Sequence, residues 1–390
     1  MKQILKETGS LAKMRTLNRN AVLSYVRNAQ ASSRTDLGRE LNLAPATVTS
    51  VVGDLMQDKL LVELEPGQSQ LIKRNRGRPQ RVVCLNPNAA FSMGVAFRVE
   101  LGVLYIDTCF SNYCGQLTYG ETLKCYPPLN FEGVFEMTIR SIDKLKDCLP
   151  NAANVVSLGL SVPGVVSDKS IIFSPYLSLI EGEALYDLLC ESLKLPIYLD
   201  NDASVLMVRE LERRPELRSA NVSYLLISQG LGSSTSLSGQ LWKASCWSGE
   251  IGHVEVPFEG QGLKSLEWIL GLDGYFAKKM ACFGIVIGDD KPISEVLLAD
   301  DGVVSLLNSY ATYLFLAVQA LNGVMGLDVI VIGGRHSAVL SYCIPRLNSL
   351  IHASPLNVRL IHASEVQYEA TEGAALLALQ QSLETLHLSN

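Results

Sequence analysis

The spacing of apolar residues near the start of the chain predicts three helices in quick succession, over residues 18–30, 33–42 and 44–61. Each segment carries apolar residues three or four positions apart, so each has one face to bury. Ser33 or Thr35 can cap the second helix, and Pro45 suits the first turn of the third. Three small hydroxyl residues are left on the outer face of that turn: Thr47, Thr49 and Ser50.

A tight connection between the second and third helices is typical of a helix-turn-helix, whose recognition helix presents small polar residues to base edges and phosphates. Residues 60–86 then predict two strands that flank a tip over 73–79. Gly77 and Pro79 keep this tip thin, so that its arginines can enter an A·T-rich minor groove. The basic residues of the tip are Lys73, Arg74, Arg76 and Arg78.

Charge is distributed unevenly along the 390 residues, although the net charge is only −6. Residues 1–86 hold 14 basic and 7 acidic residues, a balance of +7, which leaves 19 basic and 32 acidic residues, a balance of −13, for the remainder. A basic head on an acidic body is expected when only the head touches a polyanion. An ordinary three-helix core with a basic linker is the alternative, but order, position and charge together favour a winged helix-turn-helix that binds DNA.

From about residue 90 the pattern changes to alternating strands and helices, which predicts an α/β body. The apolar helix over 303–326 carries Asn308 and Gln319, so we expect a core helix and no membrane insertion. Nine dispersed cysteines without a CxxC pair, and charges at Lys2 and Glu7 in place of a signal peptide, predict a reduced, cytoplasmic protein. Hairpins are expected over 91–108 and 223–239, strands over 155–166, 196–203 and 327–334, and helices over 130–149 and 182–195.

One glycine-framed stretch, "SGEIGHVEVPFEGQGLKSLEWILG" (248–271), places Glu250 three residues before His253. This pair suits a metal site, an acid/base pair, a ligand clasp or only a loop.

Several motifs in a fixed order resemble the ROK family of bacterial sugar kinases and sugar-responsive repressors. They are "GLSVPGVVS" (159–167), "LPIYLDNDAS" (195–204), "QGLGSS" (229–234), "SGEIGH" (248–253), "VIVIGG" (329–334) and "ATEGAALLAL" (370–379). The resemblance implies an actin-like (ribonuclease H-like) body of two α/β lobes with a sugar cleft between them. It also implies the repressor branch of the family, since a winged head precedes the body.

Carried over one residue at a time, the resemblance implies a sugar-binding set, for which structural turns are the alternative reading. Carboxylates, an amide and an imidazole can satisfy paired sugar hydroxyls. The set consists of Asn201, Asp202, Glu250, His253 and Glu267. In the kinases the aspartate of this motif is the general base, and here we expect Asp202 to be vestigial, with no catalytic residue.

Two departures from the family pattern separate this chain from the kinases. The kinases carry Asp-x-Gly-Gly-Thr where this chain has "GVAFRVELG" (94–102), with Ala96 in place of the aspartate, and Ser228 and Ser234 stand at positions normally Gly. Phosphoryl transfer depends on such positioning, so we expect kinase activity to be lost. The cysteine run that binds zinc is also absent, which leaves only His253 of the zinc ligands and predicts no metal cofactor. A poor carboxylate site of His253 with Glu255 and Glu259 is the alternative.

The sequence therefore predicts a DNA head over 1–86, a first lobe over 87–200 with a returning helix over 366–385, and a second lobe over 201–365. We expect a cytoplasmic, nucleoid-associated repressor, a homodimer or homotetramer, that binds an operator in double-stranded DNA. A sugar or sugar phosphate in the cleft would be its effector. An ATP-dependent sugar kinase and a regulator that answers to a protein partner are the alternatives.

Overall fold

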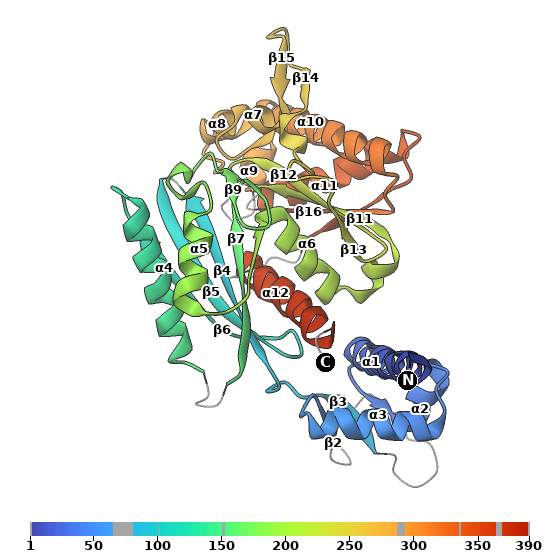
Figure 1. Cartoon of the computed structure of the whole chain (residues 1–390). Coiled ribbons are helices and arrows are strands. Elements are labelled where there is room, and N and C mark those ends of the chain that lie inside the picture. The colour runs from blue at the N-terminus through green and yellow to red at the C-terminus, as the bar shows by residue number, and fades with distance from the viewer. Residues whose placement is uncertain are drawn as a thin grey trace.

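A helical head and two α/β halves follow one another along the chain (Figure 1). The computed structural model describes residues 2–64, 81–100, 102–149, 153–286, 293–334, 337–363 and 369–388. The predicted wing tip with Lys73, Arg74, Arg76 and Arg78 lies outside the described residues.

The head has the order of elements of a winged helix. Its helices are α1 (Lys2–Ala29), α2 (Arg34–Glu40) and α3 (Pro45–Gln57). Its strands, β1 (Ser32–Ser33), β2 (Leu61–Leu64) and β3 (Val82–Leu85), form an antiparallel sheet in the order β1-β3-β2. The predicted helix-turn-helix and the two strands beside the tip are thus confirmed.

Local contacts explain these element boundaries. The hydroxyl of Ser33 caps α2 by accepting a hydrogen bond from the backbone N–H of Asp36 at 3.1 Å, and Pro45 begins α3. The prediction that the first helix begins near residue 18 was wrong, because α1 begins at Lys2. Two ion pairs at 2.6 Å, Arg15–Asp54 and Arg19–Asp58, join α1 to α3.

The body contains two mixed five-stranded sheets with the same strand order. In each sheet three consecutive strands pair antiparallel, and two later strands then add in parallel beside the first of them. The first sheet is β6 (Leu117–Cys125), β5 (Val103–Asn112), β4 (Phe91–Glu100), β7 (Val155–Val162) and β10 (Ile197–Asn201). The second is β13 (Gln240–Trp242), β12 (Leu231–Leu237), β11 (Asn221–Ile227), β16 (Val329–Gly334) and β17 (Arg359–His362). This repeated order confirms the expected actin-like body.

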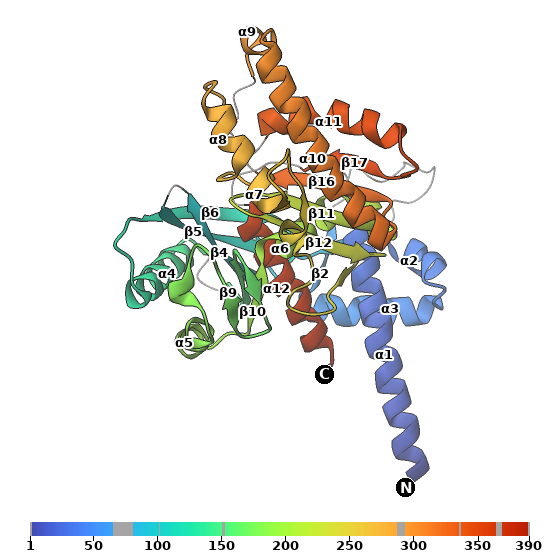
Figure 2. The ribbon, with the colours of Figure 1, turned by 90° about the horizontal axis from the view of Figure 1, so that it is seen from above.

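Helices cover the outer faces of both sheets, and two further helices lie between the sheets (Figures 1 and 2). The outer helices are α4 (Phe131–Lys146) and α5 (Ala184–Leu193) on the first sheet, and α10 (Asp301–Met325) and α11 (Ser337–His352) on the second. The inner helices are α6 (Asp202–Arg213) and α12 (Glu369–Leu388). The strand predicted over 196–203 ends at Asn201, because its side chain accepts the backbone N–H of Ser204 and begins α6 there.

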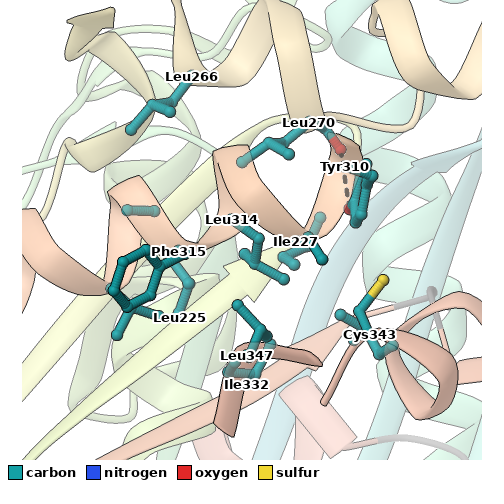
Figure 3. Close-up of a cluster of buried hydrophobic side chains, with 14 of the residues drawn as sticks. Leu225, Ile227, Leu266, Leu270, Tyr310, Leu314, Phe315, Ile332, Cys343 and Leu347 are labelled. Atoms are coloured by element: carbon teal, nitrogen blue, oxygen red, sulfur yellow. Dashed lines mark hydrogen bonds between the residues drawn. The ribbon is translucent and has the colours of Figure 1, made fainter. Parts of the chain in front are cut away.

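The second half has the larger apolar core, in which Leu225 and Ile227 of β11 meet Leu314 of α10 (Figure 3). The buried hydroxyl of Tyr310 donates to the carbonyl of Leu270 at 3.3 Å. Among the described helices, α10 alone is long and apolar enough to span a membrane, a test that core helices also pass. Its packing here is that of a core helix. Shorter elements of this half are the hairpin β14 (Glu255–Pro257) and β15 (Leu263–Ser265), with α7 (Leu266–Leu270), α8 (Tyr275–Ala281) and α9 (Glu295–Leu298).

The inner helix α12 is held at backbone contact distance on both sides. A Cβ atom at Gly159 of β7 would lie 1.9 Å from the carbonyl oxygen of Ala374, and one at Gly94 of β4 would lie 2.0 Å from that of Thr371. On the opposite side, a Cβ at Gly373 would lie 2.1 Å from the carbonyl oxygen of Val205 in α6. Only glycine allows this approach, so the sheet, α12 and α6 form one tightly packed unit.

A methyl group at the α12 contact should therefore be strongly destabilising. We expect Gly159→Ala to lower the free energy of unfolding by about 3 kcal/mol or more, because two backbones must separate. The matched control is Gly323→Ala in α10, where nothing lies within 4 Å of an added Cβ. In that variant the free energy of unfolding should rise by about 0.5–1 kcal/mol, because alanine favours a helix more than glycine does. Thermal melting of both variants tests this, and equal melting temperatures would contradict the packing described.

Candidate functional site

The strand ends of the two sheets open onto one shared cavity of about 520 Å³. The carboxyl ends of the parallel strands β4, β7 and β10 face it from one half, and those of β11 and β16 from the other. Ligands of α/β proteins bind at this edge, and the volume falls within the range of small-molecule sites. The five residues predicted to bind sugar all line it: Asn201, Asp202, Glu250, His253 and Glu267.

Asn201 and Asp202 are positioned by the junction between β10 and α6. The amide oxygen of Asn201 accepts the Ser204 N–H at 2.8 Å, and Asp202 accepts the N–H of Ala203 at 2.8 Å. Behind them, the buried carboxylate of Asp200 accepts the Asn201 N–H and pairs with Lys243 of the second half. Both side chains are thus fixed before any ligand arrives.

The carboxyl group of Asp202 is protonated more readily than usual. Burial raises its pKa to about 6, the nearby charge of Glu250 adds to the rise, and the hydrogen bond from the Ala203 N–H opposes it. Ionising Asp202 therefore lowers the stability of the folded protein. Hydrogen-bond donors of a ligand would offset that loss.

Glu250 and His253 project from one short turn. Gly249 before them has a φ of +96°, and a Cβ there would lie 1.9 Å from the Ser233 carbonyl oxygen, so only glycine fits. The imidazole Nε2 of His253 lies 3.8 Å from a carboxylate oxygen of Glu250. Burial raises the pKa of Glu250, and the charge of His253 opposes that rise. Glu250 and His253 thus lie next to each other in the cavity wall.

Glu267 lies in the first turn of α7, where the Ser265 hydroxyl caps the helix at the Trp268 N–H. Tyr176 faces it across the cavity. Burial raises the pKa of Tyr176 to about 12, with Glu267 and Asp273 contributing, so this phenol is a neutral donor at pH 7. Tyr176 and Glu369 lie outside the motifs quoted above, and Thr371 lies within the motif over 370–379 but had no site role assigned; all three line the cavity.

An aromatic cluster holds the loop that carries Glu267. Phe258 is 1% exposed and meets Trp268 and Tyr275 edge-on at 5.4 and 4.8 Å between ring centroids. Leu266 is fully buried behind this loop, and Trp268 joins the cluster. Leu263 does not pack against the loop, since it is 59% exposed on the projecting β15. In the described residues no group of three or more His, Cys, Asp or Glu side chains is arranged to hold a metal.

The end of β4 is filled by side chains. Phe97 is buried in the apolar core of the first sheet, and Ala96 lies beside it at the cavity wall. The guanidinium of Arg98 donates to Asp107 at 3.1 Å and also pairs with Glu100. Hence bulky and mutually paired groups occupy the strand end where a phosphate-binding backbone would have to be open.

The two serines that stand at positions normally Gly are separated in the structure. Ser228 lines the cavity at the end of β11. Ser234 lies within β12, where its hydroxyl is 3.4 Å from that of Ser204, and it lines a separate small polar pocket. They lie apart because the chain re-enters a strand at Leu231.

Three of the predicted DNA-contacting residues, Thr47, Thr49 and Ser50, lie along the start of α3. Thr49 and Ser50 are exposed and Thr47 is half-buried. The hydroxyl of Thr49 donates to the Pro45 carbonyl at 2.9 Å, so part of its hydrogen-bonding capacity is used within the helix. Ser50 and the half-buried Thr47 supply the other two hydroxyl groups at the start of α3.

The head and the body share one apolar core. Val22 and Val26 of α1 cluster with Tyr113 at the end of β5 and with Leu379 of α12. Arg27 stacks over the ring of Tyr113 at 5.6 Å and donates to its carbonyl at 3.2 Å. Because α12 lines the cavity at Glu369 and Thr371, one helix reaches from the cavity to the head.

The fold is therefore that of a winged-helix head joined to an actin-like body of two α/β halves, with a cavity between the halves. The ROK family model matches residues 97–263. These residues run from the end of β4 to β15 and make up less than half of the chain, and over them the chain is similar to members of the ROK family.

The chain resembles both repressors and kinases of this family. It is 25% identical to the xylose repressor of Caldicellulosiruptor bescii over 64% of this chain, and the match spans 61% of that repressor, less than two thirds of its length. It is 26% identical to the N-acetylmannosamine kinase of Vibrio vulnificus over 64% of this chain and 88% of the kinase. A ROK-family transcriptional regulator, a homologue of the E. coli Mlc protein, shares the fold with a TM-score of 0.74 and 19% identity, over 96% of this chain and 98% of that one.

The raised pKa of Asp202 predicts a pH-dependent stability. The folded state holds this proton up to about pH 6, above the ordinary value of 3.8, so the contribution of Asp202 to stability falls as pH rises from about 4 to 6 and is constant above. We expect Asp202→Asn to be about 1–2 kcal/mol more stable than the parent at pH 7.5, less than the full shift implies because the carboxyl meets cavity water. The gain should disappear at pH 4. Melting curves at both pH values test this, with the exposed Asp168→Asn as the control. A gain of equal size at both values would contradict it.

Proposed function

We propose that this protein is a sequence-specific DNA-binding transcriptional regulator, a repressor, whose DNA affinity is controlled by a sugar effector in the interlobe cavity. The observation that carries the proposal is α12, which lines the cavity at one end and packs into the head core at the other. A ligand that changes how the two halves close would thereby act on the head. The relatives named as xylose repressors support the same reading.

The head supports the DNA-binding part of this proposal. Residues 1–86 carry +7 on a chain of net charge −6. The start of α3 is exposed, as a recognition helix requires. A two-fold dimer would present two such helices to a palindromic operator, and the place of action would be the cytoplasm, at the nucleoid. The basic tip with Arg76 and Arg78 would add minor-groove contacts.

The cavity supports the effector part. Sugar hydroxyls both donate and accept, and the cavity offers three carboxylates, an amide, an imidazole and the Tyr176 phenol. A cavity of this kind can distinguish sugars that differ in one hydroxyl, because an unmatched buried group is costly. A regulator controlled only by a protein partner would instead leave the stability of the protein unaffected by any sugar.

The first test of the proposal is sequence-selective DNA binding. A preferred duplex is selected from a random DNA library, and its affinity is measured by fluorescence anisotropy at several salt concentrations. We expect Thr47→Ala/Ser50→Ala to cost about 1–3 kcal/mol of specific binding. Arg76→Ala/Arg78→Ala should weaken binding to all sequences and reduce the salt slope by about 2.

Gln57→Ala, exposed at the other end of α3, is the matched control and should bind as the parent does. If footprinting at moderate salt finds no selective site, the proposed DNA-binding function is wrong.

The kinase alternative is favoured by one observation, the retained Asp202 at the cavity wall. Against it stand Phe97 and the paired Arg98 at the end of β4. We expect no sugar-dependent release of ADP from ATP in a coupled assay across pentoses, hexoses and N-acetylhexosamines. A characterised ROK kinase serves as the positive control. Sugar-dependent turnover that Asp202→Asn abolishes would overturn the assignment as a non-enzyme.

A further inference from the structure

The cavity lining is strongly acidic. Six carboxylates line it against a single arginine in the described part of the chain. They are Glu100, Asp107, Asp202, Glu250, Glu267 and Glu369. Arg335, which follows the cavity residue Gly334, lies outside the described residues.

The two arginines that the structure describes at or behind the cavity wall are already paired with carboxylates. Arg98 is held by Asp107 at 3.1 Å and by Glu100, so this group of three has a net negative charge. Arg209 lies 3.3 Å from Glu369 but is fully buried between α6 and α12. Neither arginine is available as an unpaired partner for an anion.

The remaining three carboxylates reach the cavity from three different elements. Asp202 comes from the start of α6, Glu250 from the turn after Gly249, and Glu267 from α7. The imidazole of His253, 3.8 Å from Glu250, is the one further titratable base among the described lining residues. Apolar side chains such as Leu206, Leu226 and Leu231 form much of the remaining wall and do not screen charge.

From this charge distribution we propose that the cavity selects an uncharged sugar and rejects its phosphate ester. Neutral hydroxyls can donate to each of the three carboxylates. A phosphate would place up to two further negative charges beside them, without an unpaired arginine or lysine among the described lining residues and with its own hydration lost. The inference rests on the proposed effector function and specifies its ligand class.

The experiment compares each sugar with its own monophosphate on the full-length protein. Pentoses, hexoses and N-acetylhexosamines are titrated in pairs, with melting temperature and release of the selected DNA duplex as the two readouts. We expect at least one neutral sugar to raise the melting temperature and to change DNA affinity. Its phosphate should bind at least about 100-fold more weakly, because the added negative charge lies beside three carboxylates.

The outcomes separate the inference from the function on which it rests. A phosphate that binds as tightly as its parent sugar, or more tightly, overturns the selectivity while the effector function stands. No response to any sugar or phosphate, with DNA binding intact, overturns the effector function itself.

Two further measurements distinguish charge repulsion from a lack of space. Raising the ionic strength should reduce the difference in affinity between a sugar and its phosphate, because salt screens charges but does not enlarge a cavity. Glu100→Gln removes one partner of Arg98 and should narrow the difference several-fold. Glu255→Gln, exposed on β14 outside the cavity lining, is the matched control and should leave the difference unchanged. Discrimination that changes with neither salt nor Glu100→Gln would contradict the electrostatic origin.

Discussion

The close packing of α12 between the first sheet and α6 fixes the geometry around it. Gly94 and Gly159 let the sheet approach the helix, and Gly373 lets the helix approach α6, each at a distance that a methyl group would prevent. A fully buried arginine, Arg209, then links the same two helices through Glu372 at 3.0 Å and Glu369 at 3.3 Å. A buried charge of this kind is tolerated only while its partners stay in place, so α6 and α12 must move together.

This packed unit connects the two regions to which function is assigned. The first residues of α6 and of α12 line the cavity, and Leu379 further along α12 enters the core of the head. Asp200 and Lys243 add an ion pair between the first and second halves directly behind Asn201. Under the proposed function, a change in the cavity would reach the head through these packed helices and paired charges.

The proposed function requires a cavity that holds a sugar without transferring a phosphoryl group to it. The residues proposed to contact the sugar are held in place by the Asn201 cap and the Gly249 turn. The strand end β4 has instead been filled by Phe97 and by an arginine bound to its own neighbours. An aromatic cluster around Phe258 supports the loop of Glu267, where the zinc-binding cysteine run is missing.

The sequence by itself determined the elements and their order. Apolar spacing, the Ser33 cap and Pro45 located the helix-turn-helix, and the ordered glycine-rich motifs identified the family and five cavity residues. These signals are local, so they can be recognised in the sequence without knowledge of the fold. Only the tertiary structure brought Tyr176, Glu369 and Thr371 to the cavity, separated Ser234 from it, exposed Leu263 and paired Arg98 with Asp107. Those outcomes depend on contacts between distant segments, which hydrophobic periodicity does not encode.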